Sequence, residues 1–140
     1  MGYYLEAVIG KKSEIIKKFE SNEKLIVELN YDFSMIPLVE QLTNEIELFE
    51  GTNYDEKLLQ WLKIKSKKSL IAYISAEYFG GMGVQSIKIF ENEDIIEDIK
   101  NQDNAINHTL EYFGLKKDKN KDQFELVGLS KHRKTEDWIN

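Results

Sequence analysis

The sequence contains no cysteine, a single proline and a single arginine among its 140 residues. Without cysteine, disulfides, zinc–thiolate sites, iron–sulfur clusters and thiol nucleophiles are all excluded. No apolar run approaches the roughly 18 residues that a membrane-spanning helix needs, so the sequence predicts no membrane partner. The first ten residues, MGYYLEAVIG, lack the basic region and long apolar block of a secretory signal. We therefore expect a cytoplasmic protein.

Acidic residues outnumber basic ones, and the formal net charge is −6. This balance argues against a nucleic acid partner, because proteins that bind the phosphate backbone are usually basic. Acids dominate residues 40–56 and 91–103, while residues 57–68 carry five lysines and no acid. Such runs are most often solvated faces, but an acidic run can also dock a basic partner protein. The candidate partner-binding residues are Glu45, Glu47, Glu50, Tyr54, Glu91, Glu93 and Asp94.

The hydrophobic pattern predicts one α+β domain spanning residues 1–140, with an antiparallel sheet covered on one face by helices. At its centre we expect a β-hairpin whose strands span about 70–79 and 84–90. Ser13, Asn53 and Asp103 are candidate helix caps. The other expected strands are 3–9, 24–30 and 124–127, and the expected helices are 11–20, 34–49, 53–68 and 103–114.

The stretch AEYFGGMGVQS, residues 76–86, places three glycines after an apolar strand. A dinucleotide-binding loop would require a helix directly after the glycines, and a Walker loop would require Gly-Lys-Ser or Gly-Lys-Thr. Neither is present, because residues 84–89 alternate as a strand does. Gly80, Gly81 and Gly83 therefore predict a hairpin turn that uses positive φ angles, and not a phosphate cradle.

No set of residues in the sequence matches a known catalytic motif. Asp118 opens a segment that resembles an EF-hand loop, but Gln123 replaces the required glycine and Leu129 the final glutamate. The two histidines, His108 and His132, have no second ligand at metal-binding spacing. We predict no catalytic, cofactor-binding or metal-binding residue.

The C-terminal segment HRKTEDW concentrates polar chemistry in seven residues. His132 with Glu136 or Asp137 has the composition of an acid–base pair. The structural interpretation is stronger: Thr135 caps a terminal turn, Arg133 bridges carboxylates and Trp138 anchors the tail on the core. Glu77, an acid in an apolar strand, needs either an exposed position or a partner. We expect His132 or Arg133 to pair with Glu77.

These two segments, joined by a helix ending in EYFGL, resemble recurring blocks of a family of small bacterial proteins. The blocks read Ala-Glu-Tyr-Phe-Gly-Gly-x-Gly-x-Gln-Ser and His-Arg-x-Thr-Glu-Asp-Trp, and they cover about half of the chain. The resemblance implies an immunity protein of a bacterial toxin system. The positions that carry it are Glu77, Gly80, Gly81, Gly83, Gln85, His132, Arg133, Glu136, Asp137 and Trp138.

The expected function is thus a non-catalytic, cytoplasmic protein-binding module that neutralises a basic toxin domain through an acidic surface. An interface of this kind needs an aromatic or aliphatic anchor, for which Tyr54, Tyr78, Phe79 and Tyr112 are candidates. The alternative is a small enzyme or ligand-binding protein whose pocket lies near Glu77 and His132, with Gln85 in its wall.

Overall fold

The computed structural model describes residues 2–139 as an α+β fold built on one antiparallel sheet. The strand order is β2-β3-β1-β4-β5-β6. The strands are β1 (Tyr3–Lys11), β2 (Val27–Glu28), β3 (Phe33–Pro37), β4 (Leu70–Phe79), β5 (Met82–Glu91) and β6 (Asp94–Gln102). The helices are α1 (Lys12–Lys18), η1 (Glu20–Leu25), α2 (Glu40–Glu47), α3 (Tyr54–Lys65), α4 (Ala105–Tyr112), α5 (Gln123–Val127) and η2 (Thr135–Trp138).

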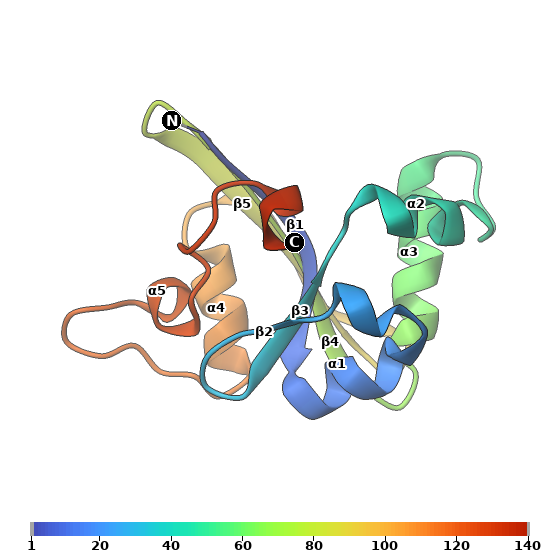
Figure 1. The fold of residues 1–140 in the computed structure, drawn as a ribbon, viewed down its shortest axis with the longest axis horizontal. Coiled ribbons are helices and arrows are strands. Elements are labelled where there is room, and N and C mark those ends of the chain that lie inside the picture. Colours follow the sequence, from blue (N-terminus) through green and yellow to red (C-terminus); the bar gives the residue numbers. More distant parts are fainter. Residues whose placement is uncertain (1, 140) are drawn as a thin grey trace.

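Helices cover both faces of the sheet, so the prediction of a single covered face is wrong. Figure 1 shows α4 and α5 on one side of the strands and α1, α2 and α3 on the other. Each side has its own apolar core, since successive side chains of a strand point to opposite faces. Ile74 and Ile106 belong to the α4/α5 side, whereas Val8 and the fully buried Trp61 belong to the α2/α3 side.

The central hairpin is confirmed, because β4 and β5 pair along their whole length from Leu70↔Glu91 to Phe79↔Met82. The strand predicted at residues 3–9 is β1, which lies between β3 and β4 at the centre of the sheet. Asn53 caps α3 as predicted, since its side chain accepts a hydrogen bond from the Glu56 amide over 2.9 Å. The predicted caps Ser13 and Asp103 are wrong, because the N-cap positions of α1 and α4 are Lys11 and Asn104, and neither of these forms a side-chain cap hydrogen bond.

Four elements differ from the sequence prediction. The segment containing Ser34 and Pro37 is the buried strand β3 and not the start of a helix; proline is tolerated there because β2 pairs only with Ser34 and Met35 and leaves that side of Pro37 without a strand partner. Residues 24–30 form the end of η1 and the two-residue strand β2. Residues 124–127 belong to the helix α5, which Asp122 caps by accepting from the Glu125 amide. The acidic segment 94–102 is the edge strand β6, which was not predicted because Asp, Glu, Asn and Lys are uncommon in strands.

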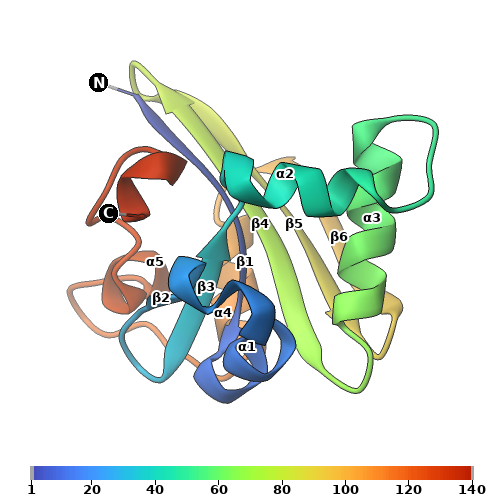
Figure 2. The same ribbon diagram turned by 45° about the vertical axis from the view of Figure 1, so that its right-hand side comes forward.

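The helices on the α2/α3 side cover only part of the strands. In Figure 2, α2 crosses in front of β4, and the tip of the β4–β5 hairpin extends beyond it together with the start of β1. The face of the sheet near the hairpin tip is therefore left without a helix on that side.

Candidate protein-binding surface

The glycines at residues 80–83 form a tight turn between β4 and β5, as the sequence predicts. Gly80 and Gly81 have φ angles of 61° and 82°, which glycine adopts without steric cost. Gly83 serves a different purpose. A Cβ atom there would lie 2.0 Å from the carbonyl oxygen of Glu77, so only glycine permits this approach of the two strands. The hairpin is thereby closed up to its last pair of residues.

Five side chains near this turn lie on the side of the sheet that α2 and α3 leave uncovered. Tyr4, Glu77 and Val84 are aligned across three strands, and Phe79 pairs with Met82 one step nearer the turn. Phe79 is 81% exposed and Met82 79%, while Tyr4 and Val84 are 42% and 40% exposed. We call this surface, formed by Tyr4, Glu77, Phe79, Met82 and Val84, the open face. Large apolar side chains gathered at this exposure are typical of interaction sites.

A carboxylate held by two tyrosines lies next to the open face. The Tyr4 hydroxyl donates to Glu6 Oε1 over 2.7 Å, and the Tyr73 hydroxyl donates to Glu6 Oε2 over 2.5 Å. Burial raises the pKa of Tyr4, and so do its hydrogen bond to Glu6 and the negative charges of Glu6, Glu77 and Glu136. This cluster was not predicted from the sequence. The available signal was Glu6 itself, an acid within the otherwise apolar pattern of the first strand.

The C-terminal tail runs beside the same end of β1. The Tyr4 amide donates to the carbonyl of Arg133 over 2.8 Å, and Lys134 forms a parallel bridge with Tyr4. Thr135 is buried; its hydroxyl accepts from the Glu6 amide over 3.1 Å and donates to the carbonyl of Tyr4. Thr135 thus joins the tail to β1, but it does not cap η2 as predicted, because the N-cap position is Lys134 and has no side-chain cap hydrogen bond.

Trp138 packs on the α4/α5 core, as the anchoring interpretation requires. The His132 and Trp138 rings pack in a T-shaped arrangement, with 4.7 Å between ring centroids. The expected pairing of Glu77 with His132 or Arg133 is not present, because no ion pair joins them in the described chain. Tyr4 of β1 lies between Glu77 of β4 and the tail. Nor does Arg133 bridge carboxylates; Arg133, Glu136 and Asp137 are exposed.

Gln85 does not share a surface with Glu77. Its side chain is buried on the opposite face of the sheet, where it donates to the Tyr78 hydroxyl and accepts from the Ile106 amide. Gln85 therefore joins β5 to α4 as a structural residue. His132 lines a separate hollow of about 370 Å³ together with Trp138. The structure thus brings no pocket together from Glu77, Gln85 and His132.

A larger groove of about 570 Å³ lies between α3 and strands β4–β6. Leu58 and Leu62 form its apolar side, and its polar lining includes Tyr73, Ser86 and Lys88. Ser86 is engaged in the fold, because its hydroxyl accepts from the Asn101 amide over 3.0 Å. Lys88 faces Asp98 at 3.8 Å. The groove adjoins the open face but holds no nucleophile paired with a base.

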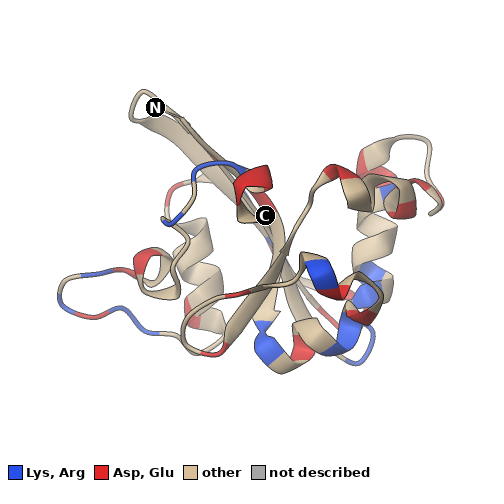
Figure 3. Cartoon of the chain, viewed as in Figure 1, with Lys and Arg blue, Asp and Glu red and all other residues tan. Residues whose placement is uncertain are grey.

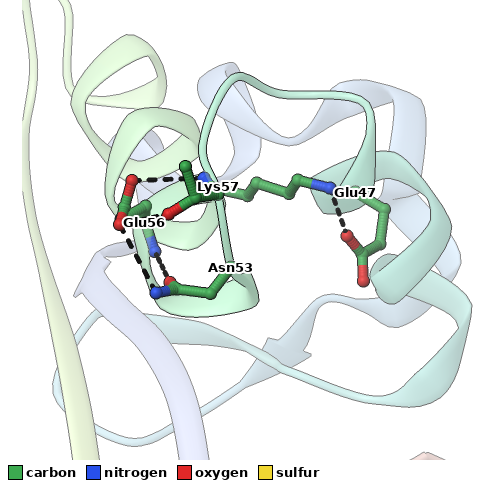
Figure 4. A network of polar contacts seen from close by, with 5 residues as sticks. Glu47, Asn53, Glu56 and Lys57 are labelled. Carbon is green, nitrogen blue, oxygen red and sulfur yellow. Dashed lines mark hydrogen bonds and ion pairs between the residues drawn. The ribbon is translucent and has the colours of Figure 1, made fainter.

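Two acids of the run around α2, Glu45 and Glu47, are paired with lysines within the fold. Lys57 pairs with Glu47 at 2.9 Å, and Glu56 binds back to the cap of its own helix (Figure 4). Glu45 accepts from the indole of Trp61 over 2.6 Å. Figure 3 shows the acidic residues of α2 next to α3, which carries the lysines. Of the candidate residues in this first acidic run, Glu50 is an exposed acid without an ion pair among residues 2–139, and Tyr54 is half-buried.

The second acidic run contains three acids that are not paired with a cation in the described part of the chain. Glu91, Glu93 and Asp94 surround the turn between β5 and β6, and we call these three residues the acidic turn. All three are exposed, and within the described part of the chain none forms an ion pair. The turn is well defined, with φ angles of 49° and 73° at Asn92 and Glu93. The Glu93 amide donates to the buried Ser66 hydroxyl over 2.9 Å.

Residues 2–139 contain no group of three or more His, Asp or Glu side chains arranged to hold a metal ion. No helix in this range has the length and hydropathy needed to cross a membrane. Asp118 accepts from the Asn120 and Lys121 amides, which lowers the pKa of its carboxyl and makes this segment a capped surface turn.

Comparison with protein-family models, with curated proteins and with solved structures found no match for this chain. The family resemblance carried by residues 76–86 and 132–138 therefore remains a prediction.

Proposed function

We propose that the chain is a non-catalytic protein-binding module, an immunity-type inhibitor that blocks a basic toxin domain in the cytoplasm of the producing bacterium. The observation that carries the proposal is the exposure of Phe79 and Met82, at 81% and 79%, on a fully paired hairpin. Because pairing fixes the backbone at both positions, an apolar anchor of this kind loses little backbone entropy on binding, which favours association.

The acidic turn supplies the electrostatic part of the proposal. Its three carboxylates have no cationic partner within residues 2–139, in contrast to Glu45 and Glu47 of α2. Together with the net charge of −6, they favour the approach of a positively charged protein. The electrostatic contribution should therefore appear mainly in the association rate.

Charge reversal tests this role directly. The triple variant Glu91→Lys, Glu93→Lys and Asp94→Lys is compared with a control triple of exposed acids elsewhere, Glu20→Lys, Glu23→Lys and Glu111→Lys. The binding partner is the purified product of the adjacent gene, and association is followed by stopped-flow fluorescence between low and high salt. We expect the first triple to slow association about 10- to 100-fold at low salt and to flatten its salt dependence.

The control triple changes the net charge equally, so it measures the nonspecific effect of charge. Equal slowing by the two triples would contradict docking through the acidic turn. If the adjacent gene product does not bind the chain, or if co-expressing the chain does not restore growth of cells that produce it, the inhibitor function itself is wrong.

A further inference from the structure

Near the hairpin tip, the strands are exposed on one side, the open face, and covered by α4 on the other. This is the geometry of a docking surface. On the opposite side of the same strands Ala76 is 1% exposed and Gln85 8%, because α4 covers them. The strands are thus fixed by a core on one side while Phe79, Met82 and Val84 remain in solvent on the other. These positions are held by pairing across β1, β4 and β5 and need no rearrangement to be presented.

Negative charge is concentrated on the open face and directly beside it. Glu6 is oriented by the two tyrosine hydroxyls, and the charges of Glu77 and Glu136 act on the same Tyr4 hydroxyl. None of these three carboxylates forms an ion pair within the described residues. Lys134 borders Tyr4 without pairing with any of them.

We propose that the open face binds a segment of a partner protein that presents an arginine to Glu6 and Glu77 and seats an adjacent apolar side chain on Phe79 and Met82. A guanidinium suits this site for two reasons. Its planar donors match carboxylates of fixed orientation, and it stacks on aromatic rings such as that of Tyr4. The inference rests on the proposed function, because it names the kind of segment that the toxin domain presents.

Charge argues against two other occupants of the same surface. A second copy of this chain, placed face to face, would bring the two sets of Glu77 and Glu136 close to one another, and these like charges repel. An anionic lipid surface would be repelled by the same carboxylates. An arginine-bearing protein segment satisfies both the apolar and the charged part of the surface.

The test uses the full chain and a synthetic probe. The probe is an N-acetylated, C-amidated hexapeptide in which leucine alternates with arginine, and its matched control replaces arginine by the uncharged isostere citrulline. Backbone amide resonances of the isotope-labelled protein are followed while the peptide is added up to about 5 mM, a range that detects weak binding. We expect saturable shifts at Tyr4, Glu77, Phe79, Met82 and Val84, and at least a 10-fold weaker affinity for the citrulline peptide.

Variants separate the charged and apolar contributions. Glu77→Gln should weaken binding of the arginine peptide about 10-fold and leave binding of the citrulline peptide unchanged. Phe79→Ser should weaken both peptides at least 10-fold, as expected for loss of an apolar anchor. The controls are Glu125→Gln, an exposed acid on α5, and Leu48→Ser, an exposed leucine (85%) at the end of α2; neither should alter binding.

Several outcomes would overturn the inference: no shifts, equal affinity for the two peptides, or shifts centred on the acidic turn. Shifts of the open-face residues on dilution of the protein alone would identify a second copy as the occupant, and binding to vesicles of anionic phospholipid would identify a membrane. Because the peptide assay does not involve the adjacent gene product, it distinguishes a failure of this inference from a failure of the proposed function.

Discussion

Glu45 tests whether the acids of α2 serve the fold rather than a partner. Its carboxylate accepts from Trp61 Nε1 over 2.6 Å and from Asn22 Nδ2 over 3.1 Å, and Lys65 Nζ lies 3.8 Å away. In Glu45→Gln the amide oxygen can satisfy one of the two donors, while the amide nitrogen faces the other. Hydrogen bonds to a charged group contribute about 1.5–3 kcal/mol each, so we expect a loss of about 2 kcal/mol in the free energy of unfolding.

Urea denaturation followed by tryptophan fluorescence measures this loss. With a slope of about 2 kcal/mol per molar urea, the midpoint should fall by about 1 M. The control is Glu47→Gln, two residues along α2. Its carboxylate is 46% exposed and pairs with Lys57 at 2.9 Å, and a surface pair of this kind contributes less than about 1 kcal/mol. Equal midpoints for Glu45→Gln and the unaltered protein would refute the structural role of Glu45.

The same variant changes the response to acid. Burial alone would raise the pKa of Glu45, but the hydrogen bonds from Trp61 and Asn22 and the charge of Lys65 hold it below its ordinary value. A carboxyl group with a lowered pKa in the folded state stabilises the protein above the pKa of the unfolded chain, and this stabilisation is lost as the pH falls through the folded-state pKa. Between about pH 5 and 3, Glu45→Gln should therefore lose less stability than the unaltered protein.

Three further predictions follow from local geometry. Gly83→Ala places a Cβ atom 2.0 Å from a carbonyl oxygen of β4, so urea denaturation should show a loss of at least about 2 kcal/mol in the free energy of unfolding. Gly81 has free space around it, so Gly81→Asn should lose less than about 1 kcal/mol. Ser34 is 1% exposed and its hydroxyl has no hydrogen-bond partner among the described residues, so Ser34→Ala should leave the urea midpoint unchanged or raise it; a clear fall would contradict this. Burial raises the pKa of Tyr3 and Tyr73, and for Tyr73 the charge of Glu6 adds to the effect. The free energy of unfolding should therefore fall as the pH rises above about 10, and in an alkaline titration these two tyrosines should ionise only as the protein unfolds.

The parts of the fold that could be predicted from the sequence are those that local signals determine. The β4–β5 hairpin follows from alternation on both sides of a glycine turn, and α3 follows from the Asn53 cap and the apolar spacing after it. Strand β3 was missed because Pro37 suggests the start of a helix, and only pairing with β1 and β2 shows that the segment is extended. The helix α5 was missed for a related reason, since four residues with mixed propensity fit either a strand or a helix turn.

The candidate surface depends on contacts that a single sequence does not reveal. Glu6 and Tyr73 are 67 residues apart, yet they share a hydrogen bond because β1 and β4 are neighbours in the sheet. Runs of charge did identify two acidic segments, but only the structure separates the internally paired acids of α2 from the unpaired acidic turn. Charge counted along the chain cannot tell which carboxylates already have partners.

The open face and the acidic turn lie at opposite ends of β5, and this separation implies distinct roles in one interface. With 10 residues at about 3.3 Å each, the ends of the strand are about 30 Å apart. A standard interface of about 800 Å² per partner is about as wide, so a single toxin domain can reach both. Charge acts over the distance of approach, whereas the apolar anchor acts only in contact. Charge reversal at the acidic turn should therefore change mainly the association rate constant, and Phe79→Ser should change mainly the dissociation rate constant. If both changes affect the same rate constant to the same extent, the two surfaces do not have these separate roles in binding.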